Sequence, residues 1–229
     1  MITIILAGGR ATRLSVSAQD IPKILVLAKG KPILEHQLDL LRVHNLFDVR
    51  LSLGHFAEKV VEYLNLRPKD EMNIDYMVEE NRLGTGGAIK FASQGLDEEF
   101  LVFNGDNVSD FNLTEFIENY ERNKPHGIVG SIGLFHWPDI SDMGYVDTEN
   151  ELIVSFKEKT GEQKPGHINA GFYILHPEIF KNIDIDQESF SIEHDVFVKL
   201  PPKSLSAHIH NGFWNELGAE DRLKEFNQS

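Results

Sequence analysis

The stretch MITIILAGGRATRL, Met1–Leu14, decides the fold. Its apolar, β-branched run Thr3–Leu6 is typical of a buried strand. The run is short and no basic segment precedes it, which argues against a secretory signal peptide. Gly8 and Gly9 follow directly, and glycine lets backbone amides approach an anion closely. We therefore expect a first buried strand that ends in an anion-binding loop.

Outward from this strand, apolar runs alternate with helical patterns. Strands are expected at Thr3–Leu6, Val49–Leu53, Ile74–Val78 and Phe100–Phe103, and helices at Pro32–His44, Phe56–Leu64 and Thr85–Ser93. The alternation predicts an α/β fold with a Rossmann-like, doubly wound, mostly parallel sheet and helices on both faces. In such sheets ligands bind beyond the carboxyl ends of the strands, so the loops there are the candidate site.

The second half of the chain has a different pattern. A helix is expected at Leu113–Asn123, and the helical spacing of its aromatic residues indicates that they belong to the core. Strands are then expected at Ile128–Leu134, Gly144–Asp147, Ile153–Lys157 and Ile168–Leu175. We expect antiparallel pairs that cover one end of the sheet, followed by short helices near Ile192–Leu200 and Glu220–Phe226. His208 and His210 share one strand face, and we interpret them as surface or edge-strand residues, not as a zinc site.

Composition limits the classes of function. The 229 residues carry no linker or repeat, so we predict a single domain over residues 1–229. The net charge of −14 argues against nucleic-acid binding, and no apolar run is long enough to span a membrane. The absence of cysteine excludes disulfides and fits a cytoplasmic protein. From Met1 to Lys31, however, five basic residues accompany one acid, which suggests a focused anion site.

The loop after the first strand has the composition of a phosphate site. Arg10 and Arg13 supply forked cationic donors beside the two glycines. The segment matches neither the GxxxxGK phosphate loop nor the GxGxxG dinucleotide fingerprint, and a tight turn with solvated arginines is the alternative. Lys23 follows Pro22, whose fixed φ stiffens the backbone. The lysine can therefore be presented to the same anion as a point charge.

LAGGRATRL followed by PK resembles the signature of the sugar-1-phosphate nucleotidyltransferases, the family that makes nucleotide sugars. The resemblance continues in order along most of the chain. It implies a GT-A-like nucleotidyltransferase fold, in which residues 1–125 mainly bind a nucleoside triphosphate and residues 126–229 mainly bind a sugar 1-phosphate. The chain departs from the pattern at Ala11, where the family usually has a glycine, and the restricted φ of alanine can change the path of the loop.

EENRLGTGGAIK, Glu79–Lys90, is similar to the base-recognition loop of the family. A carboxylate such as Glu79 can accept from both the N1–H and the exocyclic amine of guanine, which favours GTP. The alternative is that Glu79 and Glu80 are solvated loop acids. The resemblance implies catalytic roles for Arg13, Lys23 and Asp106 within a nucleotide-binding set: Leu6, Ala7, Gly8, Gly9, Arg10, Arg13, Lys23, Glu79, Gly84, Thr85 and Asp106.

Two carboxylates are implied as Mg²⁺ ligands. FLVFNGDN ends a strand at Gly105–Asp106, the family carries its metal aspartate in the same pair, and Mg²⁺ prefers one or two carboxylates plus phosphate oxygens. A helix N-cap is the alternative for Asp106. In FWNELG, Glu216 stands where the family has a second metal aspartate. Glutamate has one methylene more than aspartate. Glu216 therefore reaches the same ion only if its backbone lies farther from the ion or the ion is displaced.

MGYVD, FKEKTG and INAGFYIL resemble the segments that surround the sugar phosphate in the family. The match implies that Gly144 allows close approach and that Glu158 accepts from sugar hydroxyls. It further implies that Lys159 holds the phosphate, that Asn169 contacts the sugar, and that Asn104 belongs to the same subsite. The alternatives are a solvated charge run and a strand with a glycine bulge.

The residues of these motifs most resemble those of heptose 1-phosphate and mannose 1-phosphate guanylyltransferases. The implied enzyme transfers the GMP part of GTP to such a sugar 1-phosphate and releases pyrophosphate. Its product would be a precursor for surface-polysaccharide synthesis. The sequence leaves open whether the protein forms a homo-oligomer. A uridylyltransferase acting on N-acetylmuramate 1-phosphate or another hexose 1-phosphate is an alternative. A metal-dependent glycosyltransferase and an inactive nucleotide-sugar-binding regulator are alternatives of other classes.

Overall fold

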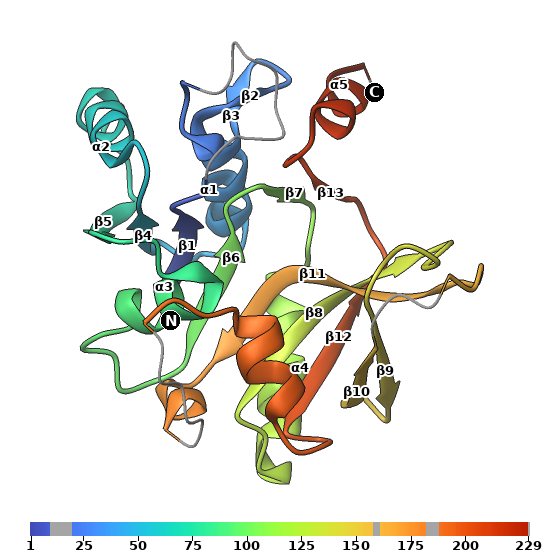
Figure 1. Cartoon of the computed structure of the whole chain (residues 1–229). Coiled ribbons are helices and arrows are strands. Elements are labelled where there is room, and N and C mark those ends of the chain that lie inside the picture. Colours follow the sequence, from blue (N-terminus) through green and yellow to red (C-terminus); the bar gives the residue numbers. More distant parts are fainter. Residues whose placement is uncertain (10–19, 158–160, 182–187, 229) are drawn as a thin grey trace.

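The computed structural model describes residues 1–9, 20–157, 161–181 and 188–228. One nine-stranded sheet runs through the molecule (Figure 1), in the order β5 (Asn73–Val78), β4 (Asp48–Leu53), β1 (Thr3–Ala7), β6 (Phe100–Asn104), β11 (Gly166–Leu175), β8 (Gly130–Trp137), β12 (Leu205–His210), β10 (Leu152–Lys157) and β9 (Tyr145–Glu149). The strands β11 and β10 run against the others. This mixed, mainly parallel sheet confirms the predicted α/β fold class.

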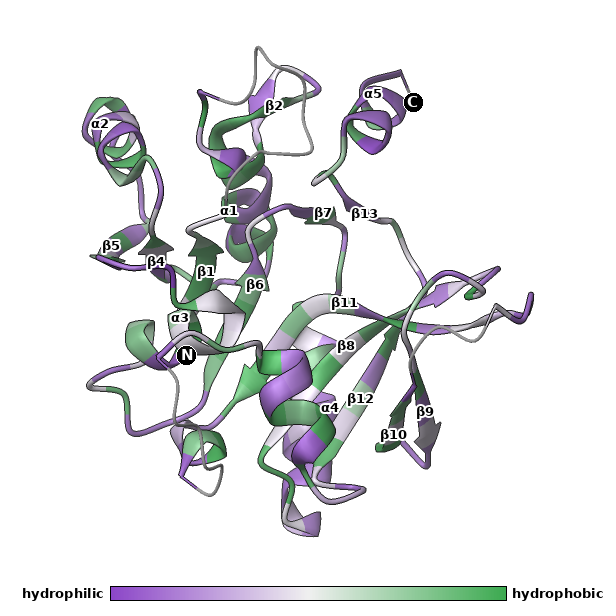
Figure 2. Ribbon diagram, viewed as in Figure 1, coloured by the Kyte–Doolittle hydropathy of each residue, from purple (hydrophilic) through white to green (hydrophobic). Residues whose placement is uncertain are grey.

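Helices cover both faces of the sheet because successive strand residues point to opposite sides. Ile5 of β1 packs in one core with residues of α1 (Ile33–Val43), α2 (Ala57–Leu66) and α4 (Leu113–Asn123). Its neighbour Ile4 packs in a second core with residues of α3 (Gly84–Ala92). In Figure 2, β1 is coloured hydrophobic, whereas α5 (Glu220–Gln228) is largely hydrophilic. The doubly wound arrangement follows from this alternation.

The second half of the chain continues the same sheet and does not merely cover its end. β11 lies antiparallel between β6 and β8, and β12 pairs parallel with β8. Two small sheets have no counterpart in the sequence prediction, β2 (Leu27–Ala28) with β3 (Lys31–Pro32) and β7 (Asn107–Ser109) with β13 (Trp214–Glu216). The prediction that Pro32 is the first helical residue is therefore wrong. The remaining short helices are η2 (Lys23–Leu25), η3 (Lys124–His126), η4 (Pro177–Phe180), η5 (Ile192–Val196) and η6 (Phe197–Lys199).

The prediction that His208 and His210 are surface or edge residues is wrong, since β12 is an interior strand. His210 is 5% exposed, and both rings pack against Phe111, with ring centroids 5.5 and 4.9 Å away. The ring Nε2 of His210 lies 3.0 Å from both the Asp110 carboxylate and the Phe213 carbonyl oxygen. The alternation rule puts two residues on one strand face but does not tell what covers that face.

The aromatic residues of α4 confirm the interpretation of that helix as part of the core. Phe116 and Tyr120 are at most 1% exposed, as is Phe111 just before the helix. The side chain of Asn112 caps α4 by accepting a hydrogen bond from the Glu115 N–H at 3.2 Å. In the described part of the chain, no helix has both the length and the apolar character needed to cross a bilayer.

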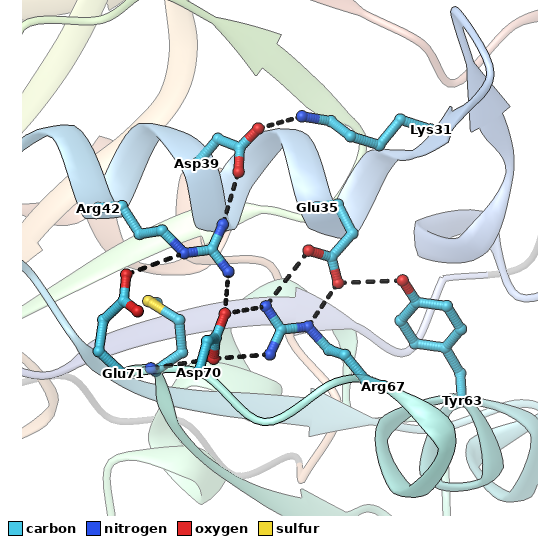
Figure 3. A network of polar contacts seen from close by, with 9 residues as sticks. Lys31, Glu35, Asp39, Arg42, Tyr63, Arg67, Asp70 and Glu71 are labelled. Carbon is cyan, nitrogen blue, oxygen red and sulfur yellow. Dashed lines mark hydrogen bonds and ion pairs between the residues drawn. The ribbon is translucent and has the colours of Figure 1, made fainter.

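An ionic network fastens α1 to the connection between α2 and β5 (Figure 3). Arg67 is only 9% exposed and pairs with both Glu35 of α1 and Asp70, each at 2.6 Å. Arg42 of α1 also pairs with Asp70, and Tyr63 donates to Glu35 at 3.0 Å. Hydrogen bonds from Arg67 hold the pKa of Asp70 well below its usual range. The network therefore stabilises the ionised carboxylate in the folded state.

Replacing Arg67 with methionine is expected to lower the free energy of unfolding by about 2–3 kcal/mol, because both the half-buried Glu35 and the more exposed Asp70 lose their partner. The exposed pair Arg122–Glu151 provides the control, and Arg122→Met should cost about 0–1 kcal/mol. A depressed pKa stabilises the fold above pH about 4 and the contribution is lost on acidification. Urea denaturation at pH 7 and pH 3 should thus show a smaller acid-induced loss in Arg67→Met than in wild type; equal losses would contradict this.

Candidate active site

A cavity lies at the carboxyl ends of β1 and β6, where ligands of open α/β sheets bind. Its lining includes Leu6, Ala7, Gly8, Gly9, Lys23, Glu79, Gly84, Thr85, Asn104 and Asp106. Every predicted nucleotide-binding residue that the structure describes lines this cavity, together with Asn104, which the sequence assigns to the sugar phosphate. Five residues of the prediction lie outside the described residues, namely Arg10, Ala11, Arg13, Glu158 and Lys159.

The glycine before Asp106 is required by a close approach of two strands. A Cβ on Gly105 would lie 2.1 Å from the Leu6 carbonyl oxygen, far inside van der Waals contact. The turn from β6 into β7 therefore holds Asp106 directly beside the end of β1. The alternative role of Asp106 as a helix N-cap is wrong, because β7 follows it and Asn112 caps the next helix.

Three charged side chains meet at Gly218, a residue that the sequence prediction missed. A Cβ on Gly218 would lie 2.5 Å from Lys23 Nζ, 2.7 Å from Glu216 Oε1 and 2.9 Å from Asp106 Oδ2. Lys23 forms an ion pair with Asp106, and the two side chains are 15% and 16% exposed. A glycine two residues after Glu216 is the signal in the sequence, since a larger residue would separate these groups.

Backbone pairing brings Glu216 to Asp106 from a distant part of the chain. β13 lies antiparallel to β7, with Glu216 opposite Asn107. The Leu217 N–H donates to the Asp106 carbonyl oxygen at 2.8 Å. On its other side, the Glu216 carboxylate lies 3.5 Å from Arg222 of α5. The additional methylene of glutamate does not keep this carboxylate away from Asp106.

Asp106 and Glu216 have the chemistry of a Mg²⁺ site that is completed by substrate. Mg²⁺ takes one or two carboxylates and fills its octahedron with water and phosphate oxygens. The two carboxylates converge beside the first cavity. The described residues hold no group of three His, Cys, Asp or Glu side chains suited to a metal ion. The pair therefore fits an ion that shares its ligands with a bound phosphate.

Glu79 is half-buried and lines the first cavity, whereas Glu80 is exposed. The interpretation as a solvated loop acid is thus wrong for Glu79 and correct for Glu80. A Cβ on Gly8 or Gly54 would lie 2.8 or 2.5 Å from Glu79 Oε1, so both glycines leave room for this carboxylate. Burial raises the pKa of Glu79, and the Leu83 N–H, which donates at 3.3 Å, opposes that shift.

The start of α3 is held against the segment before η5. Gly84 has a φ of +69°, and a Cβ there would lie 2.5 Å from the Phe190 carbonyl oxygen, so this position requires glycine. The Thr85 hydroxyl donates to Glu193 at 2.9 Å and accepts from the Ile192 N–H at 2.9 Å. Thr85 thus lines the cavity while its hydroxyl proton is donated to Glu193.

A second, polar cavity adjoins the first. Its lining includes Asn104, Asp106, Asn107, Gly144, Asn169, Trp214 and Glu216. The two cavities share Asn104 and Asp106. The predicted sugar-phosphate residues Asn104, Gly144 and Asn169 therefore lie together. The sequence prediction missed Asn107 and Trp214, which both donate to the Ala170 carbonyl oxygen, at 2.7 and 2.8 Å.

The glycine bulge that we considered for INAGFYIL is present, and it shapes the second cavity. The register of β11 on β8 shifts between Asn169 and Tyr173, and Gly171 has a φ of +73°. The Gly171 N–H donates to Asn169 Oδ1 at 2.9 Å. The bulge thus fixes the Asn169 side chain at the cavity and confirms the structural interpretation of this strand, whereas the contact of Asn169 with a sugar stays a prediction.

The fold and the site define an α/β protein in which a lysine and two carboxylates lie where two cavities meet. The chain belongs to the nucleotidyl transferase family, whose model matches residues 2–229.

Comparison with individual proteins gives the same family. The D-glycero-alpha-D-manno-heptose 1-phosphate guanylyltransferase of Campylobacter jejuni is 33% identical over 99% of this chain and 98% of its own length. Mannose-1-phosphate guanyltransferase 2 of Candida glabrata is 34% identical over 94% of this chain, which spans 60% of that protein. The crystal structure of HddC from Yersinia pseudotuberculosis complexed with GMP-PN has a TM-score of 0.84 at 29% identity, covering 99% of this chain and 98% of that chain. The resemblance to sugar-1-phosphate nucleotidyltransferases is confirmed.

Proposed function

We propose that the protein is a guanylyltransferase that forms a GDP-sugar and pyrophosphate from GTP and a heptose- or mannose-type sugar 1-phosphate. The observation that carries the proposal is the junction of the two cavities. Lys23 lines the first cavity, Glu216 lines the second and Asp106 lines both. The names of the Campylobacter relative and of the HddC complex support the choice of sugar and of base.

In the proposed reaction, a phosphate oxygen of the sugar 1-phosphate attacks the α-phosphorus of GTP in line. The bond between the α-phosphorus and the oxygen that bridges to the β-phosphorus breaks, and pyrophosphate leaves with that oxygen. The attacking phosphate is already ionised, so no general base is required. Catalysis therefore depends on positioning and on the stabilisation of charge.

The proposed roles follow from charge and, for Lys23 and the two carboxylates, from their place at the cavities; those of Arg13 and Lys159 follow from the family resemblance. Lys23 stabilises the charge that grows on the α-phosphate, and Arg13 with the loop amides holds the β- and γ-phosphates. Lys159 holds the attacking phosphate. Mg²⁺ held by Asp106 and Glu216 would neutralise phosphate charge as the bonds exchange. Each of these side chains is cationic or binds a cation, and the loop amides add neutral hydrogen-bond donors, as a reaction between two phosphates requires.

Glu79 is proposed to select guanine. Its carboxylate lines the nucleotide cavity, where it can accept from both the N1–H and the exocyclic amine of guanine. Uracil and thymine offer one donor on the same edge. The partial burial of Glu79 supports the proposal because hydrogen bonds to a carboxylate are stronger away from water.

We further propose that the two halves of the chain bind different substrates, as expected from the sequence. Residues 1–229 form one catalytic domain, in which 1–125 mainly bind the nucleotide and 126–229 mainly bind the sugar phosphate. Asn104 and Asp106 belong to residues 1–125 yet line both cavities. Where the two cavities meet, residues of the first part therefore also contribute to the proposed sugar-phosphate site. The GDP-sugar would serve surface-polysaccharide synthesis, and the reaction belongs in the cytoplasm, where nucleoside triphosphates are available.

A pyrophosphate-release screen tests the proposal. GTP, ATP, UTP and dTTP are each combined with mannose, heptose, glucose and N-acetylmuramate 1-phosphates in the presence of Mg²⁺. We expect the highest kcat/KM with GTP and either the heptose or the mannose compound. Product with UTP and none with GTP would contradict the guanine assignment. Ligand binding by calorimetry without turnover of any pair would identify an inactive regulator instead.

A further inference from the structure

One carboxylate outside the predicted site joins residues of both cavities. Glu193 of η5 accepts hydrogen bonds from three hydroxyls, those of Thr85 at 2.9 Å, Ser191 at 2.7 Å and Tyr173 at 3.2 Å. Thr85 lines the nucleotide cavity. Tyr173 in turn bonds to Asn169, which lines the second cavity. Two hydrogen-bonded arms therefore run from Glu193, one to each cavity.

The arm through Tyr173 fixes the orientation of the Asn169 amide. Tyr173 is fully buried, and burial together with the nearby Glu193 raises its pKa well above the ordinary value, so the phenol keeps its proton. That proton goes to Glu193, and the phenol oxygen accepts from Asn169 Nδ2 at 2.9 Å. The amide can donate in this way only with its oxygen turned to Gly171.

The arm through Thr85 fixes the hydroxyl in the nucleotide cavity. A hydroxyl has one proton and two lone pairs. The Thr85 proton goes to Glu193, and one lone pair accepts from the Ile192 N–H. Towards a nucleotide, the Thr85 hydroxyl can therefore act as an acceptor, but not as a donor while Glu193 holds its proton.

We propose that Glu193 is a positioning residue that sets the hydrogen-bonding direction of Thr85 in the nucleotide subsite and of Asn169 in the sugar-phosphate subsite. The inference rests on the proposed function, which assigns the two subsites. Glu193 acts through its neighbours, so both arms depend on this one carboxylate, and the arm to Asn169 can be removed without the arm to Thr85.

Three variants separate the arms. Glu193→Ala removes both, and Tyr173→Phe removes the arm to Asn169 while it keeps Glu193 and the aromatic ring. Ser191→Ala is the matched control, because it removes a hydrogen bond to the same carboxylate oxygen as Thr85 but belongs to neither arm. The measurements are kcat and KM for each substrate, and calorimetric Kd values for GTP alone and for the sugar 1-phosphate alone.

We expect Glu193→Ala to raise KM and Kd for both substrates about tenfold, the effect of one lost hydrogen bond to a polar group that has become unsatisfied. Tyr173→Phe should raise them about tenfold for the sugar 1-phosphate and less than twofold for GTP. Ser191→Ala should leave all values within about twofold of wild type.

Two results would overturn the inference. If Glu193→Ala weakened sugar-phosphate binding while Tyr173→Phe did not, Glu193 would contact the sugar directly. If Ser191→Ala changed the constants as much as Glu193→Ala, the effect would be a general loss of structure in η5. Wild-type turnover separates these outcomes from a failure of the proposed function, which would appear as the absence of pyrophosphate release in wild type.

Discussion

Replacing Asp106 with asparagine is expected to reduce kcat for pyrophosphate release by a factor on the order of 10²–10³. The substitution keeps the size of the side chain and removes a charge that lies where the two cavities join. It also removes the carboxylate that pairs with Lys23, so the lysine and any bound cation lose their common partner. The measurement is initial rate at saturating GTP and sugar 1-phosphate, titrated with Mg²⁺.

Glu216→Gln is the informative comparison for Asp106→Asn. If both carboxylates hold the ion, Glu216→Gln should raise the Mg²⁺ concentration for half-maximal rate at least several-fold, in line with the charge dependence of hard-cation sites. An unchanged Mg²⁺ profile would leave Asp106 to bind the ion without Glu216. Near wild-type turnover of Asp106→Asn would remove Asp106 from the catalytic set altogether. Glu178→Gln, at an exposed carboxylate paired with Lys181, controls for general loss of charge.

Lys23→Met is expected to lower kcat by a similar factor, on the order of 10²–10³, because a cation near the reacting phosphate is lost. A second effect should have the opposite sign. Lys23 neutralises Asp106 in the structure, so its removal leaves the carboxylate pair more negative, and the half-saturating Mg²⁺ concentration should fall. Lower turnover together with tighter Mg²⁺ binding distinguishes a catalytic lysine from one that only supports the metal site.

Lys31→Met is the matched control for Lys23→Met. Lys31 belongs to the same cationic N-terminal segment, but it pairs with Asp39 on the outer side of α1. Its replacement should leave both kcat and the Mg²⁺ profile close to wild type. If Lys23→Met kept wild-type turnover, the α-phosphate would have to be stabilised by other groups, and the role assigned to Lys23 would be wrong.

The strands and helices with strong periodicity could be predicted from the sequence. The range Leu113–Asn123 coincides with α4, and the predicted ranges for β1, β4 and β6 differ from the observed ones by a residue at an end. These elements bury regular apolar faces, which is what periodicity reports. The three-residue strands β7 and β13 are too short to show a period, and their pairing depends on the rest of the fold.

The candidate site was predictable where motif and local chemistry agree, as for Lys23 and Asp106, which the structure places in contact. Glu193 gave no such signal, because its neighbours in sequence form only a short helix and its partners Thr85 and Tyr173 come from other elements. His210 shows the opposite failure. The strand pattern of His208 and His210 is correct, but the packing of both rings against Phe111 is a tertiary property that the pattern does not contain.

The pairing of β7 with β13 has a consequence for how activity is acquired. Asp106 and Glu216 lie in different halves of the chain and meet through Leu217 and the β7–β13 ladder. A contact of such sequence separation costs loop-closure entropy that early, local structure does not recover. A folding intermediate with β1, α1 and β6 in place would hold the glycine loop and Asp106 but lack the second carboxylate. If Glu216 is the second Mg²⁺ ligand, as proposed, turnover requires the completed β7–β13 pairing, and nucleotide affinity and turnover need not appear together as the protein folds.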